Sequence, residues 1–187
     1  MTQRFDFIPT FVNDLFVCTR KPINHDLGSF VRTFCSEEFL RAGLTKPIAQ
    51  INQTLTRNKG ALRGLHFQYP PHGEAKITNC LKGSVFDVAV DIRRGSPTFL
   101  KWHGEILSEE NDMSMVIPEG FAHGFQALTT DCEMLYLHTA PFVSEAEGGI
   151  QPTDPTIGIE WPLEITDMST RDKGLMLVVP GFEGIDV

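Results

Sequence analysis

Residues 60–68 read Gly-Ala-Leu-Arg-Gly-Leu-His-Phe-Gln and place Arg63 and His66 in one short, mostly apolar segment. A guanidinium can hold a phosphate or polarise an oxygen, and a neutral imidazole can remove a proton near pH 7. The pair therefore suggests chemistry on an anionic small molecule. The alternative is a strand with one solvent-reaching arginine and one core histidine, which is the more ordinary outcome for such a segment taken alone.

Arg63 and His66 can reach one ligand only if their strand is irregular. Successive side chains of a strand alternate between its faces, so the two point to opposite faces of a regular strand. Gly64 lies between them and is a suitable place for a bulge or bend. Lys76 is a further candidate cation for the same pocket.

A histidine that acts as a general base needs a group that orients its other ring nitrogen. Three carboxylates are candidates for this role: Asp87, Asp91 and Asp172. Asp172 is also explained as the acidic half of a helix capping box that begins at Ser169. Tyr136 is one of only two tyrosines beside 14 phenylalanines, which suggests that its hydroxyl donates a proton. On pattern alone, a partly buried tyrosine with a bonded hydroxyl explains it as well.

Of the four histidines weighed as ligands, His66 and His123 lie inside strand-like patterns, and His72 and His103 are more peripheral. A metal-binding jelly roll typically offers His-x-His on one strand, but the residue two positions after His66 is Gln68. A metal site would need a third ligand from elsewhere in the chain. We therefore expect no bound metal.

The composition limits the classes of protein to which the chain can belong. The 187 residues, 41% hydrophobic and 21% charged, predict one globular domain with a sizeable core. A net charge of −8 argues against a nucleic-acid or anionic-membrane partner. The chain shows neither an apolar run of membrane length nor a signal-peptide pattern, and its four cysteines are far apart in sequence. We expect reduced thiols, a cytoplasmic location and no membrane partner.

Short strands separated by turn residues dominate the pattern, which predicts an all-β sandwich or barrel. The helix signals are few: residues 36–43, with Ser36 as cap and Gly43 as end, and a short helix after Ser169. The chain becomes loop-rich from residue 142. The expected strands are 7–18 as a pair or an edge strand, 30–34, 48–56, 62–69, 75–81, 84–92, 99–107, 111–117, 121–128 and 133–138.

Two of these strands carry polar residues on one face. In 48–56 that face holds Gln50, Asn52, Thr54 and Thr56, so it either lines a polar cavity or forms the solvent side of a sheet. In 84–92, Phe86, Val88, Val90 and Ile92 form an apolar face. The opposite face of 84–92 contains two aspartates, and we expect it to be either solvated or functional.

The chain resembles the dTDP-4-dehydrorhamnose 3,5-epimerase family of cupin-like nucleotide-sugar epimerases. The segments that carry the resemblance occur in family order and cover most of the chain. They are 62–68, 74–76, 83–93, 95–99, 107–111, 117–125, 135–136, 154–162 and 169–172.

The resemblance implies a cupin-like jelly roll that needs no metal or other cofactor, and a homodimer that exchanges N-terminal strands within residues 1–35. It implies a substrate whose C4 ketone acidifies the protons on C3 and C5. His66 would be the base, oriented by Asp172, and Tyr136 would return a proton from the opposite face of the ring. Lys76, with Arg63, would stabilise the enolate oxygen.

The resemblance also assigns residues to substrate binding. Arg63 would lie near the diphosphate, and Gln50 and Asn52 would contact nucleotide and sugar. His123 with Asp87 matches a supporting buried pair. Phe142 stands where relatives have an aromatic pair, and Phe30 lies in a segment that touches the nucleotide of the partner subunit.

Two positions depart from the family pattern. Leu27 replaces an expected arginine, and Arg32 replaces a usual glutamate. The first change removes a cation from the diphosphate site, and the second either restores one or alters base preference. The sequence therefore specifies the type of reaction more closely than it specifies the nucleotide that the substrate carries. The alternatives are an epimerase that inverts one carbon of another nucleotide-linked 4-ketosugar, a cupin that binds sugar nucleotides without catalysis, and a metal-dependent cupin enzyme.

Overall fold

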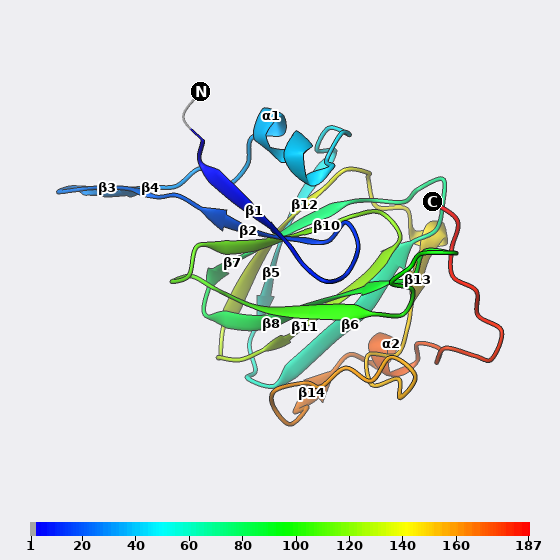
Figure 1. Cartoon of the computed structure of the whole chain (residues 1–187). Helices are drawn as coiled ribbons and strands as arrows, with labels where there is room; N and C mark the ends of the chain where they lie inside the picture. The colour runs from blue at the N-terminus through cyan, green and yellow to red at the C-terminus, as the bar shows by residue number, and fades with distance from the viewer. Residues whose placement is uncertain (1–2) are drawn as a thin grey trace.

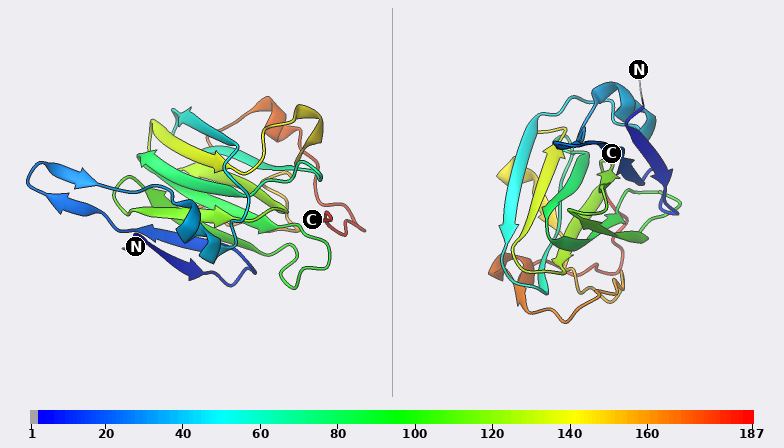
Figure 2. Two further views of the ribbon diagram at one scale, coloured as in Figure 1. Left: turned by 90° about the horizontal axis from the view of Figure 1, so that it is seen from above. Right: turned by 90° about the vertical axis from the view of Figure 1, so that its left-hand side faces the viewer.

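Two antiparallel β-sheets pack face to face in the computed structural model, which describes residues 3–187 (Figures 1 and 2). The first sheet has the strand order β1 (Phe5–Pro9), β2 (Phe16–Arg20), β10 (Met113–Ile117), β7 (Lys76–Lys82), β12 (Cys132–His138), β5 (Gln50–Thr56). The second has the order β13 (Glu147–Gly149), β6 (Ala61–Gln68), β11 (Phe121–Ala127), β8 (Ser84–Asp91), β9 (Trp102–Ser108), and β14 (Asp167–Met168) runs parallel to β6. This is a cupin-like jelly roll, as predicted.

The N-terminal hairpin differs from the prediction. The expected strand over 30–34 is wrong, because β4 (Gly28–Phe30) ends at Phe30. It pairs with β3 (Ile23–His25), and together they project from the body of the molecule as an arm (Figure 2). Every residue of both strands is exposed, and Leu27 at the tip is 95% exposed. Burial imposes no alternation on such an arm, so periodicity could not reveal it.

The helices are short. The first predicted helix is α1 (Ser36–Phe39) continued by η1 (Leu40–Ala42), and it ends at Gly43 with φ +78°, as predicted. Ser36 is not its cap, because it already lies in the first turn. The others are η2 (Ser144–Ala146) and α2 (Thr170–Lys173). No helix within residues 3–187 is both long and apolar enough to cross a bilayer.

Strand β8 is buried on both faces. Its Val88 and Val90 belong to a core cluster with Ile150, Ile157 and Ile185, so the C-terminal segment covers the outer face of the second sheet. The face of β8 with aspartates is not solvated: Asp87 and Asp91 are fully buried. Each carboxylate is instead bonded by neighbouring side chains, as a buried charge requires.

The four cysteines are free thiols. Three of them are buried, and burial raises the pKa of both Cys18 and Cys80 to about 12. These thiols therefore stay protonated at neutral pH and serve as small apolar core residues.

Candidate active site

A cavity of about 370 Å³ opens between the two sheets and gathers most of the sequence-predicted residues. On the first sheet, β12 lies between β5 and β7, and the register places Gln50, His138 and Lys76 in one row and Asn52, Tyr136 and Thr78 in the next. The second sheet and α2 supply the opposite wall. The predicted residues that line the cavity are Gln50, Asn52, Arg63, His66, Lys76, His123, Tyr136, Phe142 and Asp172.

The predicted irregularity at Gly64 is present in β6. His123 pairs with His66 and Phe125 pairs with Arg63, so β6 contains one more residue than β11 over this stretch. Gly64 has φ +109°, and a Cβ there would lie 2.6 Å from the Cα of Gly124. Only glycine suits such a position. The bulge lets Arg63 and His66 line the same cavity.

His66 is paired with Asp172, which the residue pattern left open among three aspartates and which the resemblance implied. The distance from His66 Nε2 to Asp172 Oδ1 is 2.8 Å, and the backbone N–H of Gly64 donates to Oδ2 at 3.3 Å. Asp172 accepts the Nε2 hydrogen, which leaves Nδ1 as the basic nitrogen. Burial acts to raise the pKa of Asp172, but the hydrogen bond and charge of His66, together with the hydrogen bonds of Gly64 and Ser169, outweigh it and hold the pKa below its ordinary value.

The capping-box explanation of Asp172 is half correct. Ser169 is the N-cap of α2, and its hydroxyl accepts the backbone N–H of Asp172 at 3.0 Å. The carboxylate of Asp172 reaches across to β6. The cap therefore fixes the backbone at the point from which the side chain meets His66.

Tyr136 faces the same cavity from the opposite sheet. Its hydroxyl lies 3.2 Å from the hydroxyl of Thr54, and its ring is buried. Burial raises the pKa of Tyr136 well above its ordinary value, although the Thr54 bond acts in the other direction. The phenol is therefore protonated at neutral pH and able to donate.

Four ionisable residues in the described lining of the cavity were not among the predicted site residues: Glu74, His138, Glu147 and Arg171. Glu74 Oε1 lies 3.0 Å from Lys76 Nζ, and Glu74 Oε2 lies 3.0 Å from His138 Nδ1. Lys76 Nζ is also 3.5 Å from the carbonyl oxygen of His66. The sequence did contain a signal, because His138 follows Tyr136 by two residues and so shares its face of the strand.

A second histidine–carboxylate pair lies deeper. His123 Nε2 is 2.7 Å from Asp87 Oδ1, and the Thr78 hydroxyl donates to Asp87 Oδ2 at 2.6 Å. The ring of His123 packs against that of Tyr136, with centroids 6.1 Å apart. This network matches the supporting pair that the resemblance implied.

Phe142 and Gln50 lie together at the cavity mouth, where the backbone N–H of Phe142 donates to Gln50 Oε1 at 3.0 Å. Phe30 and Arg32 lie outside this lining. Phe30 is exposed on the arm, and Arg32 Nη1 is 3.4 Å from Glu38 Oε1. Within one chain, the structure does not bring these two residues to the site.

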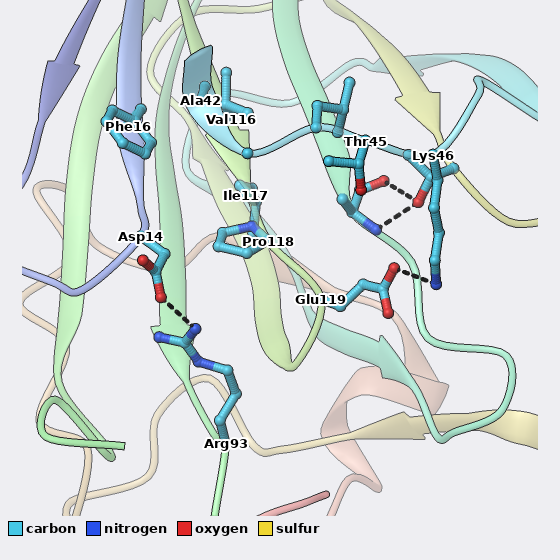
Figure 3. A pocket seen from close by; sticks show the side chains of 14 residues that line it. Asp14, Phe16, Ala42, Thr45, Lys46, Arg93, Val116, Ile117, Pro118 and Glu119 are labelled. Atoms are coloured by element: carbon cyan, nitrogen blue, oxygen red, sulfur yellow. Dashed lines mark hydrogen bonds and ion pairs between the residues drawn. The ribbon is translucent and has the colours of Figure 1, made fainter. Parts of the chain in front are cut away.

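A second cavity of similar volume, about 370 Å³, shares no lining residue with the first among residues 3–187 (Figure 3). Its charged side chains neutralise one another. Lys46 Nζ lies 2.6 Å from Glu119 and Arg93 Nη1 lies 2.8 Å from Asp14. Residues 3–187 also contain no group of three or more His, Cys, Asp or Glu side chains placed to hold a metal ion. The two cavities have similar volumes, so volume does not identify the active site. We take the first cavity as the candidate active site because of the ionisable side chains that line it.

Known proteins resemble this chain over nearly its whole length. The family model for dTDP-4-dehydrorhamnose 3,5-epimerase matches residues 9–178. The dTDP-4-dehydrorhamnose 3,5-epimerase of Methanothermobacter thermautotrophicus is 41% identical over 173 residues, which cover 90% of this chain and 92% of that protein.

Solved structures agree with the sequence comparison. The dTDP-6-deoxy-D-glucose-3,5-epimerase of Legionella pneumophila, in complex with dTDP-4-keto-L-rhamnose, has a TM-score of 0.91 and 36% identity, with 98% of each chain covered. A 3′-monoepimerase of Streptomyces bikiniensis, in complex with dTDP-quinovose, has a TM-score of 0.81 and 31% identity, with 90% of this chain and 86% of that chain covered. With the family model and these relatives in agreement, the chain belongs to the dTDP-4-dehydrorhamnose 3,5-epimerase family.

Proposed function

We propose that this protein epimerises a nucleotide-diphosphate 4-keto-6-deoxyhexose at C3, C5 or both, in the manner of dTDP-4-dehydro-6-deoxyglucose conversion to dTDP-4-dehydrorhamnose. One observation carries the proposal: His66 and Tyr136 belong to opposite sheets and line one cavity. Inversion of a carbon requires a proton to leave one face of the sugar ring and another to arrive on the opposite face. A base and an acid on opposite walls meet that requirement.

In the proposed reaction, His66 removes the proton next to the C4 ketone. The C–H electrons form a carbon–carbon double bond, and the ketone oxygen becomes an enolate oxygen that Lys76 and Arg63 stabilise. Tyr136 then donates its proton to the other face as the ketone re-forms. Asp172 keeps His66 oriented and stabilises its protonated form.

Substrate binding follows from the remaining lining. Arg63 holds the diphosphate, because a guanidinium matches phosphate geometry. Gln50 and Asn52 contact nucleotide and sugar, and the half-exposed ring of Phe142 at the mouth stacks on the base. His123 supports the wall behind Tyr136. The complex with dTDP-4-keto-L-rhamnose in the Legionella relative supports this ligand class.

A homodimer that exchanges N-terminal strands is part of the proposal. The arm of β3 and β4 leaves the body of the chain and exposes Ile23, Leu27 and Phe30, a set of apolar side chains that a partner would cover. Phe30 and Arg32 would then serve the partner's nucleotide site. Sedimentation of the wild type as a dimer, and of a variant with Ile23→Ser and Phe30→Ser as a monomer, is the expected result. A cytoplasmic location also belongs to the proposal, since free thiols suit a reducing compartment.

The test of the reaction is deuterium incorporation from heavy water into dTDP-4-keto-6-deoxyglucose, read at C3 and C5 by NMR. Label at both carbons with inversion supports a 3,5-epimerase. Label at one carbon supports the second candidate, a single-carbon epimerase, which the likeness to the Streptomyces 3′-monoepimerase favours. Absence of label from folded protein contradicts both on this substrate, and binding of a panel of nucleoside diphosphates then tests for another nucleotide.

A further inference from the structure

Lys76 is a buried ammonium with a defined set of partners. Glu74 Oε1 pairs with Nζ at 3.0 Å, and the carbonyl oxygen of His66 lies at 3.5 Å. An ammonium has three hydrogens, and within residues 3–187 the third has no protein acceptor. Lys76 lines the cavity, so this hydrogen is the one available to a substrate oxygen.

Glu74 is itself held at both oxygens. Its second oxygen, Oε2, meets His138 Nδ1 at 3.0 Å and accepts from Gln68 Nε2 at 3.4 Å. The carboxylate is nearly inaccessible to solvent. Burial acts to raise the pKa of Glu74, but its bonds with His138 and Lys76 outweigh that effect and hold the pKa below its ordinary value. A carboxylate bonded on both sides cannot rotate away from Lys76.

His138 connects this pair to two other walls of the cavity. Its Nε2 lies 3.5 Å from Asn52 Nδ2 on β5, and its ring packs against Tyr136 at a centroid distance of 6.1 Å. In the sheet register, His138 is directly opposite Lys76. The chain of contacts from Asn52 through His138 and Glu74 to Lys76 therefore ties the ammonium to β12 and the edge strand β5 of the first sheet.

We propose that Glu74, braced by His138, is a positioning residue that fixes the Lys76 ammonium where the enolate oxygen develops. The inference rests on the proposed function. It gives the oxygen-stabilising cation its own carboxylate, just as the base His66 has Asp172. Without Glu74, Lys76 would be a buried charge that has lost its paired carboxylate, and a misplacement of about 1 Å can cost about 10²-fold in rate.

A double-mutant cycle with Glu74→Ala and Lys76→Met tests the proposal, with deuterium wash-in as the rate. We expect Glu74→Ala to lower kcat by about 10- to 100-fold with KM within about 2-fold, because a contact made mainly in the transition state is lost. In the Lys76→Met background the same substitution should change kcat by less than about 2-fold, since Glu74 acts only through Lys76. Glu74→Gln, which keeps an oxygen for Nζ, should retain more activity than Glu74→Ala.

Matched controls separate positioning from a general loss of structure. Glu133→Ala removes a carboxylate of the same sheet that bonds Gln53 outside the cavity, and it should leave kcat unchanged. A Glu74→Ala effect that multiplies fully with that of Lys76→Met, or a kcat equal to the wild type, overturns the inference while the proposed function stands. A wild-type protein that incorporates no deuterium overturns both.

Discussion

His66 and His123 are opposite each other on neighbouring strands, and each bonds a buried carboxylate through Nε2. The two pairs differ in access. The His66 side chain is 29% exposed, whereas that of His123 is 7% exposed. Their carboxylates also differ in origin, because Asp172 comes from the C-terminal α2 and Asp87 from the adjacent strand β8.

The difference shows that a histidine–carboxylate pair is not by itself a catalytic device. A base must reach the proton it abstracts, and His66 lines the cavity with room for a substrate beside it. His123 also lines the cavity, but its side chain is nearly buried, its Nε2 is bonded to Asp87 and its ring packs against Tyr136. In the proposed mechanism, catalysis therefore belongs to the open pair, His66 and Asp172, and the closed pair, His123 and Asp87, supports the wall that carries Tyr136.

The largest expected effect is on the open pair. His66→Asn removes the base, and kcat should fall by about 10² to 10⁴-fold, the usual contribution of general acid–base catalysis. Deuterium wash-in measures the rate, and circular dichroism with nucleotide titration shows that fold and binding persist. Retention of kcat within a few-fold would remove His66 from the mechanism.

Asp172→Asn should have the next largest effect, with a loss of about 10²-fold in kcat. An amide at this position no longer stabilises protonated His66, and its NH₂ group can face Nε2 and favour the wrong tautomer. The KM should change little, because the substrate does not touch Asp172 in the proposed mechanism. A rise in KM with constant kcat would contradict the orienting role.

A substitution in the closed pair, His123 and Asp87, should mainly lower the stability of the folded protein. Asp87→Asn weakens the bonds to His123 and Thr78 in a fully buried site, and the free energy of unfolding should fall by about 1–3 kcal/mol. Urea denaturation measures this loss. The kcat of the folded Asp87→Asn protein should fall less than that of Asp172→Asn. If Asp87→Asn lowered kcat more than Asp172→Asn, His123 rather than His66 would belong to the catalytic pair.

The smallest effect is the pH dependence of stability. Because the native pKa of Asp172 lies below its ordinary value of 3.8, its ionised form stabilises the folded state at neutral pH. That contribution is complete above the ordinary value and is lost as pH falls through the native pKa. Urea denaturation between pH 6 and pH 3 should therefore show that the free energy of unfolding falls less steeply with acid in Asp172→Asn than in the wild type. The same pH dependence in both proteins would contradict this role of the ionised carboxylate.

Sequence patterns predicted the strands of five or more residues in both sheets, because a strand of that length shows the alternation by which it is recognised. They missed the exposed arm of β3 and β4 and the short strands β13 and β14, which have only two or three residues each. They also predicted the bulge at Gly64, since glycine between two functional residues has a specific conformational meaning.

Residue pattern alone could not choose the partner of His66 among Asp87, Asp91 and Asp172, whereas the family resemblance pointed to Asp172. All three are buried in the structure, and only the fold shows that Asp87 meets His123 and that Asp91 holds Arg93. Glu74 was missed because an acidic residue in a loop has no distinctive spacing, and His138 was missed although its spacing of two residues from Tyr136 placed it on the same strand face. Their role becomes visible only through the cross-strand register.

The Asp172–His66 contact also orders events during synthesis. The two residues are 106 positions apart, so the base is made long before its orienting carboxylate leaves the ribosome. The strands of both sheets precede α2 in the chain, and they can associate while the C-terminal segment is still absent. A nascent chain that stops short of α2 would then contain His66 without its orienting carboxylate, and the C-terminal segment would complete both the core of the second sheet and the base.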